Sequence, residues 1–493
     1  MISSHLPALQ VVLPLISAPV CVLIRKGLVA WMFAVAVSWI TFVIALALLV
    51  HVVANGPLSY AMGGWAAPYG IVYRIDLLTA FVLIIVAGMG ALVTTSAFRV
   101  APGDMSRDHQ NFFFGIFLLV LTGLLGITVT GDAFNLYVFL EISSLASYAL
   151  VALGRDRRAL MAAFQYLIMG TIGATFILAG IGLLYAVTGT LNMEDLAQRL
   201  QQVDDSRAVK AAFAFIVVGA SLKLALFPLH AWLPNAYTHA PALVSAFLAA
   251  TATKVGVYVL VRFIYTVFGG VFSFETMSLG PILMVFGLCA ALVSSLVAIF
   301  QENVKRMFAY SSVAQIGYMV LGLSFASHTG LTAAIVHIFN HAAMKGALFL
   351  ALACAVYRLG SVELSELRGL GRRMPITFAC IVIAGLSLIG VPLTGGFVSK
   401  WYLVSAALEQ DLWLVAAAVL VSSLFAVVYV WRVVEVAYFQ SPPDGKGARC
   451  EAPASLVIPT VALAVACIYF GIDTEPTVGV ARAAANELLA SIP

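Results

Sequence analysis

Apolar stretches long enough to cross a lipid bilayer recur from one end of the 493-residue chain to the other. A helix of about 20 apolar residues spans the hydrocarbon core of a membrane, and the pattern predicts about 14 such spans. We therefore predict an all-α polytopic membrane protein. The predicted spans cover residues 7–24, 28–53, 76–97, 112–130, 133–153, 160–188, 211–227, 241–265, 278–300, 307–325, 330–357, 376–408, 412–438 and 454–472.

Two of these spans contain helix breakers. The seventh ends at Phe227 and Pro228, and residues 390–396 of the twelfth hold a proline among several glycines. Proline removes a backbone donor and glycine relaxes the backbone, so both helices are expected to be broken inside the membrane. Interrupted helices in corresponding positions are typical of transporters that are built from inverted repeats.

The loops between predicted spans are short, so a single membrane domain is expected over residues 1–493. Residues 1–100 hold helices 1–3, residues 111–265 hold helices 4–8 as a first repeat, and residues 278–438 hold helices 9–13 as a second. Residues 454–493 hold helix 14 and a tail.

Composition and charge agree with a membrane protein. The chain is 62% hydrophobic and 10% charged, which excludes an ordinary soluble domain. Lysine and arginine gather at the loop ends of one side, for example at Arg157, Arg158, Lys305 and Arg306. By the positive-inside rule these ends lie in the cytoplasm, so a multi-pass protein of the cell (inner) membrane is expected, with both termini outside.

Charged side chains nevertheless occur within the apolar spans. They are Lys223, Lys254, Lys345 and Lys400, with the carboxylate of Glu141. A charged group at the centre of a bilayer costs roughly 2.5–3.5 kcal/mol on insertion scales, so such groups usually have a function. Membrane-embedded charges of both signs indicate ion or proton movement.

Glu141 and Lys223 are expected to be partners, because a nearby charge of opposite sign lets both groups stay ionised. The alternatives are a static ion pair and a lysine that reaches toward the membrane surface. Lys254 and Lys400 are candidates for proton transfer, and the alternative for each is a static hydrogen-bonded lysine.

His337, His341 and Lys345 recur at i, i+4 and i+8, so they lie on one face of a helix. Histidine exchanges protons near neutral pH, which favours a proton relay over a metal site that no carboxylate or thiol would complete. His230 and His239 flank the first helix break and form a possible proton entrance. No metal and no cofactor is expected, since motifs for zinc-protease, nucleotide-phosphate and haem attachment sites do not occur.

Several motifs together resemble one known family. They are residues 227–236 and 254–258, residues 305–312, His341 with Lys345, and residues 390–400. These segments are similar to the antiporter-like subunits shared by respiratory complex I and Mrp-type sodium/proton antiporters. The resemblance covers about residues 75–470, and the length and Lys400 are closest to the D subunit of the Mrp type.

The resemblance implies 14 helices, two inverted five-helix repeats and a proton route along the membrane midplane. Glu141 then resembles the carboxylate of the fifth helix, Lys223 the lysine of the broken seventh and Lys254 that of the eighth. Lys400 resembles the ionisable residue of the broken twelfth. Asn235 departs from the family, which commonly has aspartate there.

These observations predict a proton-translocating subunit of a multisubunit antiporter for Na⁺ or another monovalent cation, and not an enzyme. Its expected partners are other membrane subunits, the lipid bilayer, protons and a monovalent cation, without nucleic acid. One alternative is a proton-pumping subunit of a complex I-like oxidoreductase or membrane hydrogenase. Another is a membrane subunit of a proton-coupled bicarbonate-uptake complex.

Overall fold

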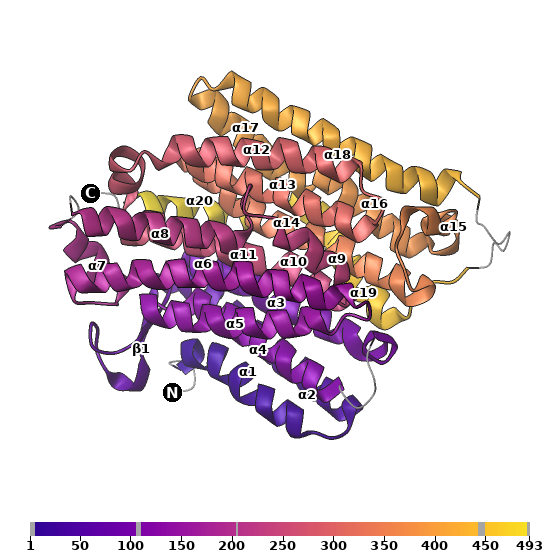
Figure 1. Cartoon of the computed structure of the whole chain (residues 1–493), viewed down its shortest axis with the longest axis horizontal. Helices are drawn as coiled ribbons and strands as arrows, with labels where there is room; N and C mark the ends of the chain where they lie inside the picture. Colours follow the sequence, from indigo (N-terminus) through magenta and orange to yellow (C-terminus); the bar gives the residue numbers. More distant parts are fainter. Residues whose placement is uncertain (1–4, 105–109, 204–205, 442–448, 491–493) are drawn as a thin grey trace.

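The computed structural model describes residues 5–104, 110–203, 206–441 and 449–490. Its long helices lie side by side in one bundle, with β1 and α7 near one end and α15 at the other (Figure 1). The helices are α1 (Leu6–Leu23), α2 (Gly27–Asn55), α3 (Leu77–Asp104), α4 (Gln110–Val129), α5 (Ala133–Ala152), α6 (Arg158–Thr188), α7 (Met193–Leu200), α8 (Arg207–Leu224), α9 (Trp232–His239), α10 (Ala242–Ala250), α11 (Ala252–Val261), α12 (Leu279–Ile299), α13 (Val304–Ser324), α14 (His328–Leu359), α15 (Leu370–Arg373), α16 (Pro375–Ile389), α17 (Gly395–Glu409), α18 (Trp413–Phe439), α19 (Ala454–Ile472) and α20 (Glu475–Ala490).

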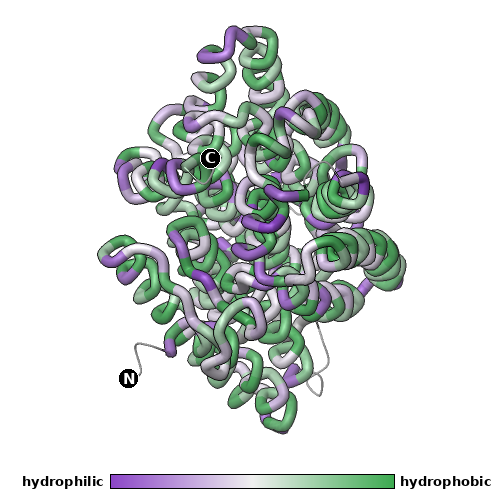
Figure 2. Tube along the Cα trace, turned by 90° about the vertical axis from the view of Figure 1, so that its left-hand side faces the viewer, coloured by the Kyte–Doolittle hydropathy of each residue, from purple (hydrophilic) through white to green (hydrophobic). Residues whose placement is uncertain are grey.

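Within the described residues, eleven helical segments are long and apolar enough to cross a membrane. The chain is thus a multi-pass membrane protein, as predicted. The other three predicted spans fall on α8, on α13 and on the pair α16 and α17. The span of α8 and that of α16 and α17 are broken, and α13 is more polar. The count of 14 therefore stays a prediction. Figure 2 looks along the bundle and shows mostly hydrophobic helices at the periphery, with several hydrophilic segments near the middle.

Both predicted helix breaks are present. α8 ends at Ala225, which has a left-handed backbone (φ 61°), and α9 begins at Trp232. α16 ends at the left-handed Gly390 (φ 90°), and α17 begins at Gly395. A residue in the left-handed region just after a helix is a common stop signal, because it turns the chain while its N–H still caps the last turn.

A third break, at Thr251, was not predicted. It divides the eighth span into α10 and α11 and has a backbone of φ −124° and ψ −56°. Its sequence context contains neither proline nor glycine at the break. Some short elements outside the spans were also missed. A two-stranded antiparallel hairpin joins β1 (Leu58–Ala61) to β2 (Val72–Ile75), and α20 occupies the expected tail, while the fold class is all-α as predicted.

Corresponding local structures support the expected internal duplication. An isolated β-bridge joins Asp132, the N-cap of α5, to Asn192, and another joins Asn303, the N-cap of α13, to Glu363. In each case the N-cap side chain accepts a backbone N–H at the start of its helix. The two halves thus begin alike, although the repeat boundaries themselves stay a prediction.

Glycine lets helices approach closely at two places. A Cβ atom on Gly219 of α8 would lie 2.6 Å from the carbonyl oxygen of Gly173 on α6, and one on Gly317 of α13 would lie 2.6 Å from that of Gly287 on α12. Small residues allow this contact in membranes, where van der Waals packing between helices replaces the hydrophobic effect. α8 and α13, which carry or position candidate lysines, are therefore tightly held.

A buried ion pair fixes the N-terminal helices to the first repeat. Arg262, in the π-helical turn η4 (Arg262–Val267), contacts the carboxylate of Asp76 just before α3. The guanidinium also donates to Thr79 Oγ1 at 2.7 Å and to Tyr258 OH at 3.0 Å. Both charged groups lie near the ends of membrane spans, Asp76 just before α3 and Arg262 just after α11.

Candidate functional site

Lys223 lies in the last turn of α8, directly before the break. Its Nζ donates to Ser144 Oγ on α5 at 2.8 Å. The residue is at a helix C-terminus, where free carbonyl groups favour a positive charge. Trp232 of α9 donates to the carbonyl of Leu222 at 3.1 Å and stacks on Tyr166 of α6, with ring centroids 4.1 Å apart. These contacts keep the break and its lysine in place.

Glu141 lies one helical turn before Ser144 on the same face of α5. No ion pair within 4.0 Å joins it to Lys223 in the described part of the chain. Its Oε1 is buried without a hydrogen-bond partner there. Ser144, and not Glu141, is therefore the hydrogen-bond partner of Lys223, and sequence reasoning missed it because serine is common in helices of this chain.

Lys254 is fully buried in the first turn of α11. Its Nζ contacts the carbonyl oxygen of Ala249, in the last turn of α10, and lies 3.3 Å from Thr253 Oγ1. The break at Thr251 leaves the last carbonyls of α10 without helical partners, and the ammonium satisfies one of them. The unpredicted break thus explains how the lysine is held.

The histidine and lysine side chains of α14 lie in the centre of the bundle, as the helical spacing predicts. The rings of His337 and His341 are parallel to within 2°, with centroids 5.9 Å apart. His337 Nδ1 lies 2.7 Å from Ser399 Oγ on α17. Lys345 donates to the Phe308 carbonyl at 2.8 Å and to Ser311 Oγ at 2.5 Å, both on α13.

Several ring nitrogens on this helix are buried without a partner among the described residues. They are Nε2 of His337 and both nitrogens of His341. Buried polar atoms in proteins are nearly always hydrogen-bonded, and water is the partner that fits a polar interior. No group of three or more His, Cys, Asp or Glu side chains in the described ranges is suited to a metal ion.

Lys400 repeats the arrangement of Lys254 at the second break. Its Nζ donates to the carbonyls of Leu388 and Ile389 at the end of α16, at 3.0 and 2.9 Å. A third bond of 2.9 Å reaches Ser423 Oγ on α18, and the ring of Tyr318 lies 4.9 Å away. Ser399 and Ser423 were not predicted, since only their distance to a titratable group marks them.

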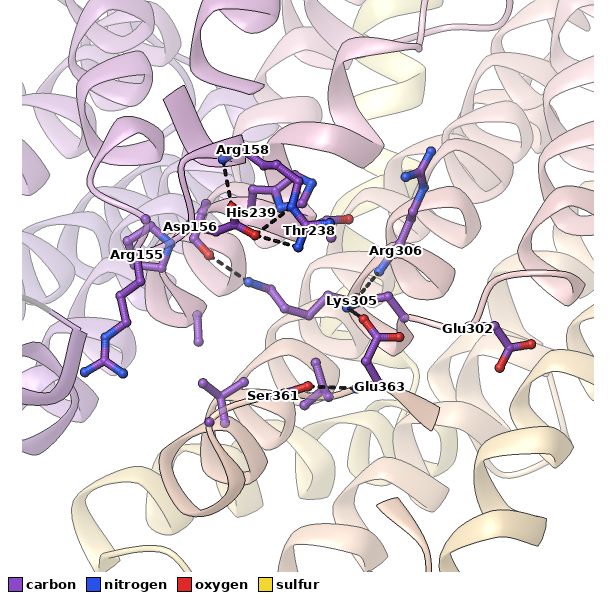
Figure 3. Close-up of a pocket in the computed structure, with 18 residues that line it drawn as sticks. Arg155, Asp156, Arg158, Thr238, His239, Glu302, Lys305, Arg306, Ser361 and Glu363 are labelled. Carbon is purple, nitrogen blue, oxygen red and sulfur yellow. Dashed lines mark hydrogen bonds and ion pairs between the residues drawn. The ribbon is translucent and has the colours of Figure 1, made fainter. Parts of the chain in front are cut away.

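A polar cavity of about 460 Å³ opens at the basic end of the bundle, between the two halves (Figure 3). Arg155, Arg158, Lys305 and Arg306 surround it together with acidic groups and His239. Lys305 donates to the Ala240 carbonyl at 2.7 Å and so caps α9. The other labelled residues are Asp156, Thr238, Glu302, Ser361 and Glu363.

Hydrogen bonds between neighbouring side chains hold the acidic groups of this cavity in place. The Arg158 guanidinium donates to Asp156 at 2.6 Å and holds the pKa of that carboxyl below its usual range. Asn303 donates to Glu363 at 2.8 Å. Burial lowers the pKa of His239, and the neighbouring Arg158 lowers it further. Of the two histidines expected at the entrance, only His239 lines the cavity. His230 packs on Phe227 at the break and does not line the cavity.

The expected site residues lie on α5, α8, α11, α14 and α17, among which α8 packs against α11 and α14 packs against α17. Asn235 lies in α9, just after the first break, where the resemblance leads us to expect aspartate. Its side-chain amide donates to Gln165 Oε1 at 2.7 Å.

Comparison with known proteins agrees with this architecture. The chain is 42% identical to NADH-quinone oxidoreductase subunit N of Desulforudis audaxviator, over 96% of this chain and 97% of that protein. It is 29% identical to the D-type component of the Na(+)/H(+) antiporter of Bacillus subtilis, over 95% and 94%. A chain of the Mrp complex from Dietzia sp. superposes with a TM-score of 0.90 at 25% identity, covering 99% of this chain and 98% of that one. The family described as "NADH:quinone oxidoreductase/Mrp antiporter, TM" matches residues 130–426, and the chain belongs to it.

Proposed function

We propose that this chain is the proton-translocating subunit of a multisubunit monovalent cation/proton antiporter, of the D type. Protons pass along Glu141, Lys223, Lys254, the α14 residues and Lys400. The observation that carries this proposal is the series of titratable side chains inside the bundle on α5, α8, α11, α14 and α17. The chain itself is a transporter subunit of the cell membrane, with both termini outside, and the cation crosses elsewhere in the assembly.

The contacts of the lysines support transfer rather than static pairing. In the described residues, Lys254, Lys345 and Lys400 each donate to backbone carbonyls and serine or threonine hydroxyls, and no carboxylate lies within ion-pair distance. A lysine locked to a buried carboxylate would hold its proton firmly. A lysine held by neutral dipoles stays ordered whether or not it carries the proton, so it can release and regain one.

The cavity at the basic end provides a plausible entrance. It brings solvent to His239, and Lys305 on its wall lies one turn before Phe308, whose carbonyl accepts from Lys345. A proton that enters there is therefore close to the middle of the series. Changing the charge of one member alters the proton affinity of the next, which couples the two halves.

A second candidate is a subunit of a redox-driven proton pump. The specific observation in its favour is the 42% identity to a subunit named for NADH-quinone oxidoreductase, against 29% for the antiporter relative. The same series of side chains would serve in both, because only the source of energy differs.

The deciding experiment is purification of the intact complex and its reconstitution into vesicles with a pH-sensitive dye inside. An antiporter is expected to acidify or alkalinise the lumen when a Na⁺ or K⁺ gradient is imposed, without any electron donor. Proton movement that required NADH and a quinone, together with iron–sulfur subunits in the preparation, would replace the first candidate by the second. No proton movement under either drive would reject both.

A further inference from the structure

Positive charge dominates the surroundings of His239 in the basic-end cavity. Arg158, Lys305 and Arg306 line the cavity with it, and all three oppose protonation of its imidazole. Of the carboxylates that line the cavity, Asp156 favours the protonated form. A positive potential repels protons, so cations around a proton entrance call for an anion that balances them.

The acidic side chains of the cavity are already engaged by donors. Each carboxylate has a donor of its own at 2.6–2.9 Å, namely Arg158 for Asp156, Arg432 for Glu302 and Asn303 for Glu363. Arg155 completes the charged lining. None of these contacts within the described ranges involves Arg306, so the acidic groups of the protein leave this guanidinium without a counter-charge.

Arg306 is the strongest sign of a ligand in the cavity. Its Nε atom is buried and has no hydrogen-bond partner among the described residues. Its guanidinium carbon lies 5.9 Å from the centre of the Tyr310 ring on the same helix. A buried charged donor that lacks an acceptor is destabilising, and such groups are nearly always paired, so an acceptor from outside the chain is expected here.

The start of α10 offers further donors to the same cavity. Its N-cap is Pro241, which has neither an N–H group nor a capping side chain, and its first residue, Ala242, lines the cavity. The first N–H groups of a helix have no partner within the helix, and together with the helix dipole they favour an anion. Lys305 crosses the cavity and donates to the Ala240 carbonyl at 2.7 Å, which holds the first turn of α13 beside this helix start (Figure 3).

Phosphate is the anion that fits this set of donors. A guanidinium binds phosphate oxygens through two parallel hydrogen bonds, an ammonium binds them as a point charge, and a helix N-terminus adds backbone N–H groups. The cavity volume of about 460 Å³ lies within the range of roughly 300–1,000 Å³ that is typical of small-molecule sites. The headgroups of anionic phospholipids and inorganic phosphate in solution both present this chemistry at a membrane surface.

We propose that the basic-end cavity binds a phosphate group, from an anionic phospholipid or from solution, which offsets the cations around His239 and promotes proton uptake there. The effect on transport rests on the proposed function, whereas the binding does not. Bound phosphate gives Arg306 an acceptor. It also counteracts the neighbouring positive charges that lower the pKa of His239, so the imidazole gains its proton at a higher pH.

Reconstitution of the intact complex tests the effect and separates the two sources of phosphate. Vesicles contain either phosphatidylglycerol or only phosphatidylcholine, each with and without inorganic phosphate, and proton uptake from the basic face is measured against external pH. We expect phosphatidylglycerol, inorganic phosphate or both to raise the midpoint of uptake by about one pH unit, a tenfold gain in proton affinity. The arm that produces the shift identifies the source, and no shift in any arm would overturn the proposal.

Charge variants separate a specific site from the general surface potential of anionic vesicles. Arg306→Gln is expected to lose most of the shift and Arg306→Lys to recover part of it. Arg157→Gln is the matched control and is expected to keep the shift, because Arg157 is exposed at the same end of the bundle and does not line the cavity. An equal shift in Arg306→Gln and Arg157→Gln would overturn the proposal in favour of surface potential alone.

Binding is also measured without transport. The amount of phosphatidylglycerol that stays with the complex purified in detergent, and the retention of radiolabelled inorganic phosphate, are compared between the unsubstituted chain and Arg306→Gln. We expect retention of one of the two probes to fall at least about fivefold in the variant, roughly 1 kcal/mol. Equal retention of both probes would overturn the site. Retention that depends on Arg306 in a complex that moves no protons would instead reject the proposed function.

Discussion

The Nζ atom of Lys223 on α8 lies 2.8 Å from the Oγ atom of Ser144 on α5, one helical turn from Glu141. The serine is therefore the hydrogen-bond partner of the lysine, while the carboxylate lies one turn away on α5 and makes no ion pair with the lysine among the described residues. This arrangement lets the pair form and separate with a small side-chain movement, whereas a direct buried ion pair would be harder to open.

Replacement of Glu141 by glutamine is expected to abolish proton transport, by at least about a hundredfold or roughly 2.7 kcal/mol, while the complex still assembles. The amide keeps the size of the carboxyl group and removes its ability to hold a proton. Transport by the reconstituted complex measures the loss, and Glu275→Gln, on the exposed surface, is the matched control. Retained transport in Glu141→Gln would contradict the scheme.

Ser144→Ala is expected to slow transport about tenfold on its own and to have little further effect in a chain that already carries Glu141→Gln. The two residues act in one step, so their effects should not add. A double-mutant cycle on the transport rate measures this coupling. Additive effects would show that the serine only supports the fold.

Lys254→Arg separates proton transfer from helix capping. Arginine keeps a positive charge and can still donate to the carbonyl of Ala249, but it does not release a proton in proteins. We expect a folded, assembled complex without proton transport. Lys210→Arg, near the start of α8 and away from the series of titratable side chains, is the control. An active Lys254→Arg variant would assign the lysine a purely structural role.

The pH response on the basic face is expected to depend on His239. Since burial and Arg158 lower the pKa of this imidazole, it is neutral at pH 7 and gains protons only at lower pH. Proton uptake from this face should rise mainly as the pH falls below about 6.5, the ordinary pKa of imidazole, and the rise should be smaller in His239→Gln. Stopped-flow dye measurements at fixed internal pH test this. An unchanged pH profile would remove His239 from the entrance.

Disruption of the Asp76–Arg262 ion pair is expected to lower the stability of the protein rather than its transport activity. Asp76→Ala leaves the guanidinium buried without its counter-charge, which costs about 3 kcal/mol. The variant should unfold at a lower temperature in detergent, and the double variant Asp76→Ala with Arg262→Ala should recover part of the loss. A double variant as unstable as the sum of both changes would show that the two side chains do not depend on each other.

The hydrophobic pattern predicted the helices well, and the spacing on α14 predicted which of its polar side chains share a face. Proline and glycine marked two of the three helix breaks. The break at Thr251 carries neither proline nor glycine, so no single residue marks it in the sequence. Residues 58–75 form a hairpin through pairing between segments that a pattern of single residues does not reveal.

The partners of the titratable groups were beyond the reach of the sequence. Glu141 and Lys223 have opposite charges and were expected to meet, yet the lysine donates to Ser144. The carbonyl groups that hold Lys254 and Lys400 belong to the backbone, which has the same chemistry at every residue. Only the three-dimensional path of the backbone decides which carbonyl groups lack a hydrogen-bond partner within their own helix.

The two helix breaks have a consequence for direction. The helix after the first break carries the neutral amide of Asn235, whereas the helix after the second carries the ammonium of Lys400. Two chemically identical halves in opposite orientation would conduct equally well both ways. Because the two positions differ in charge, the two halves are electrostatically different. We expect protons to pass faster in one direction than in the other, and the favoured direction to depend on these two positions.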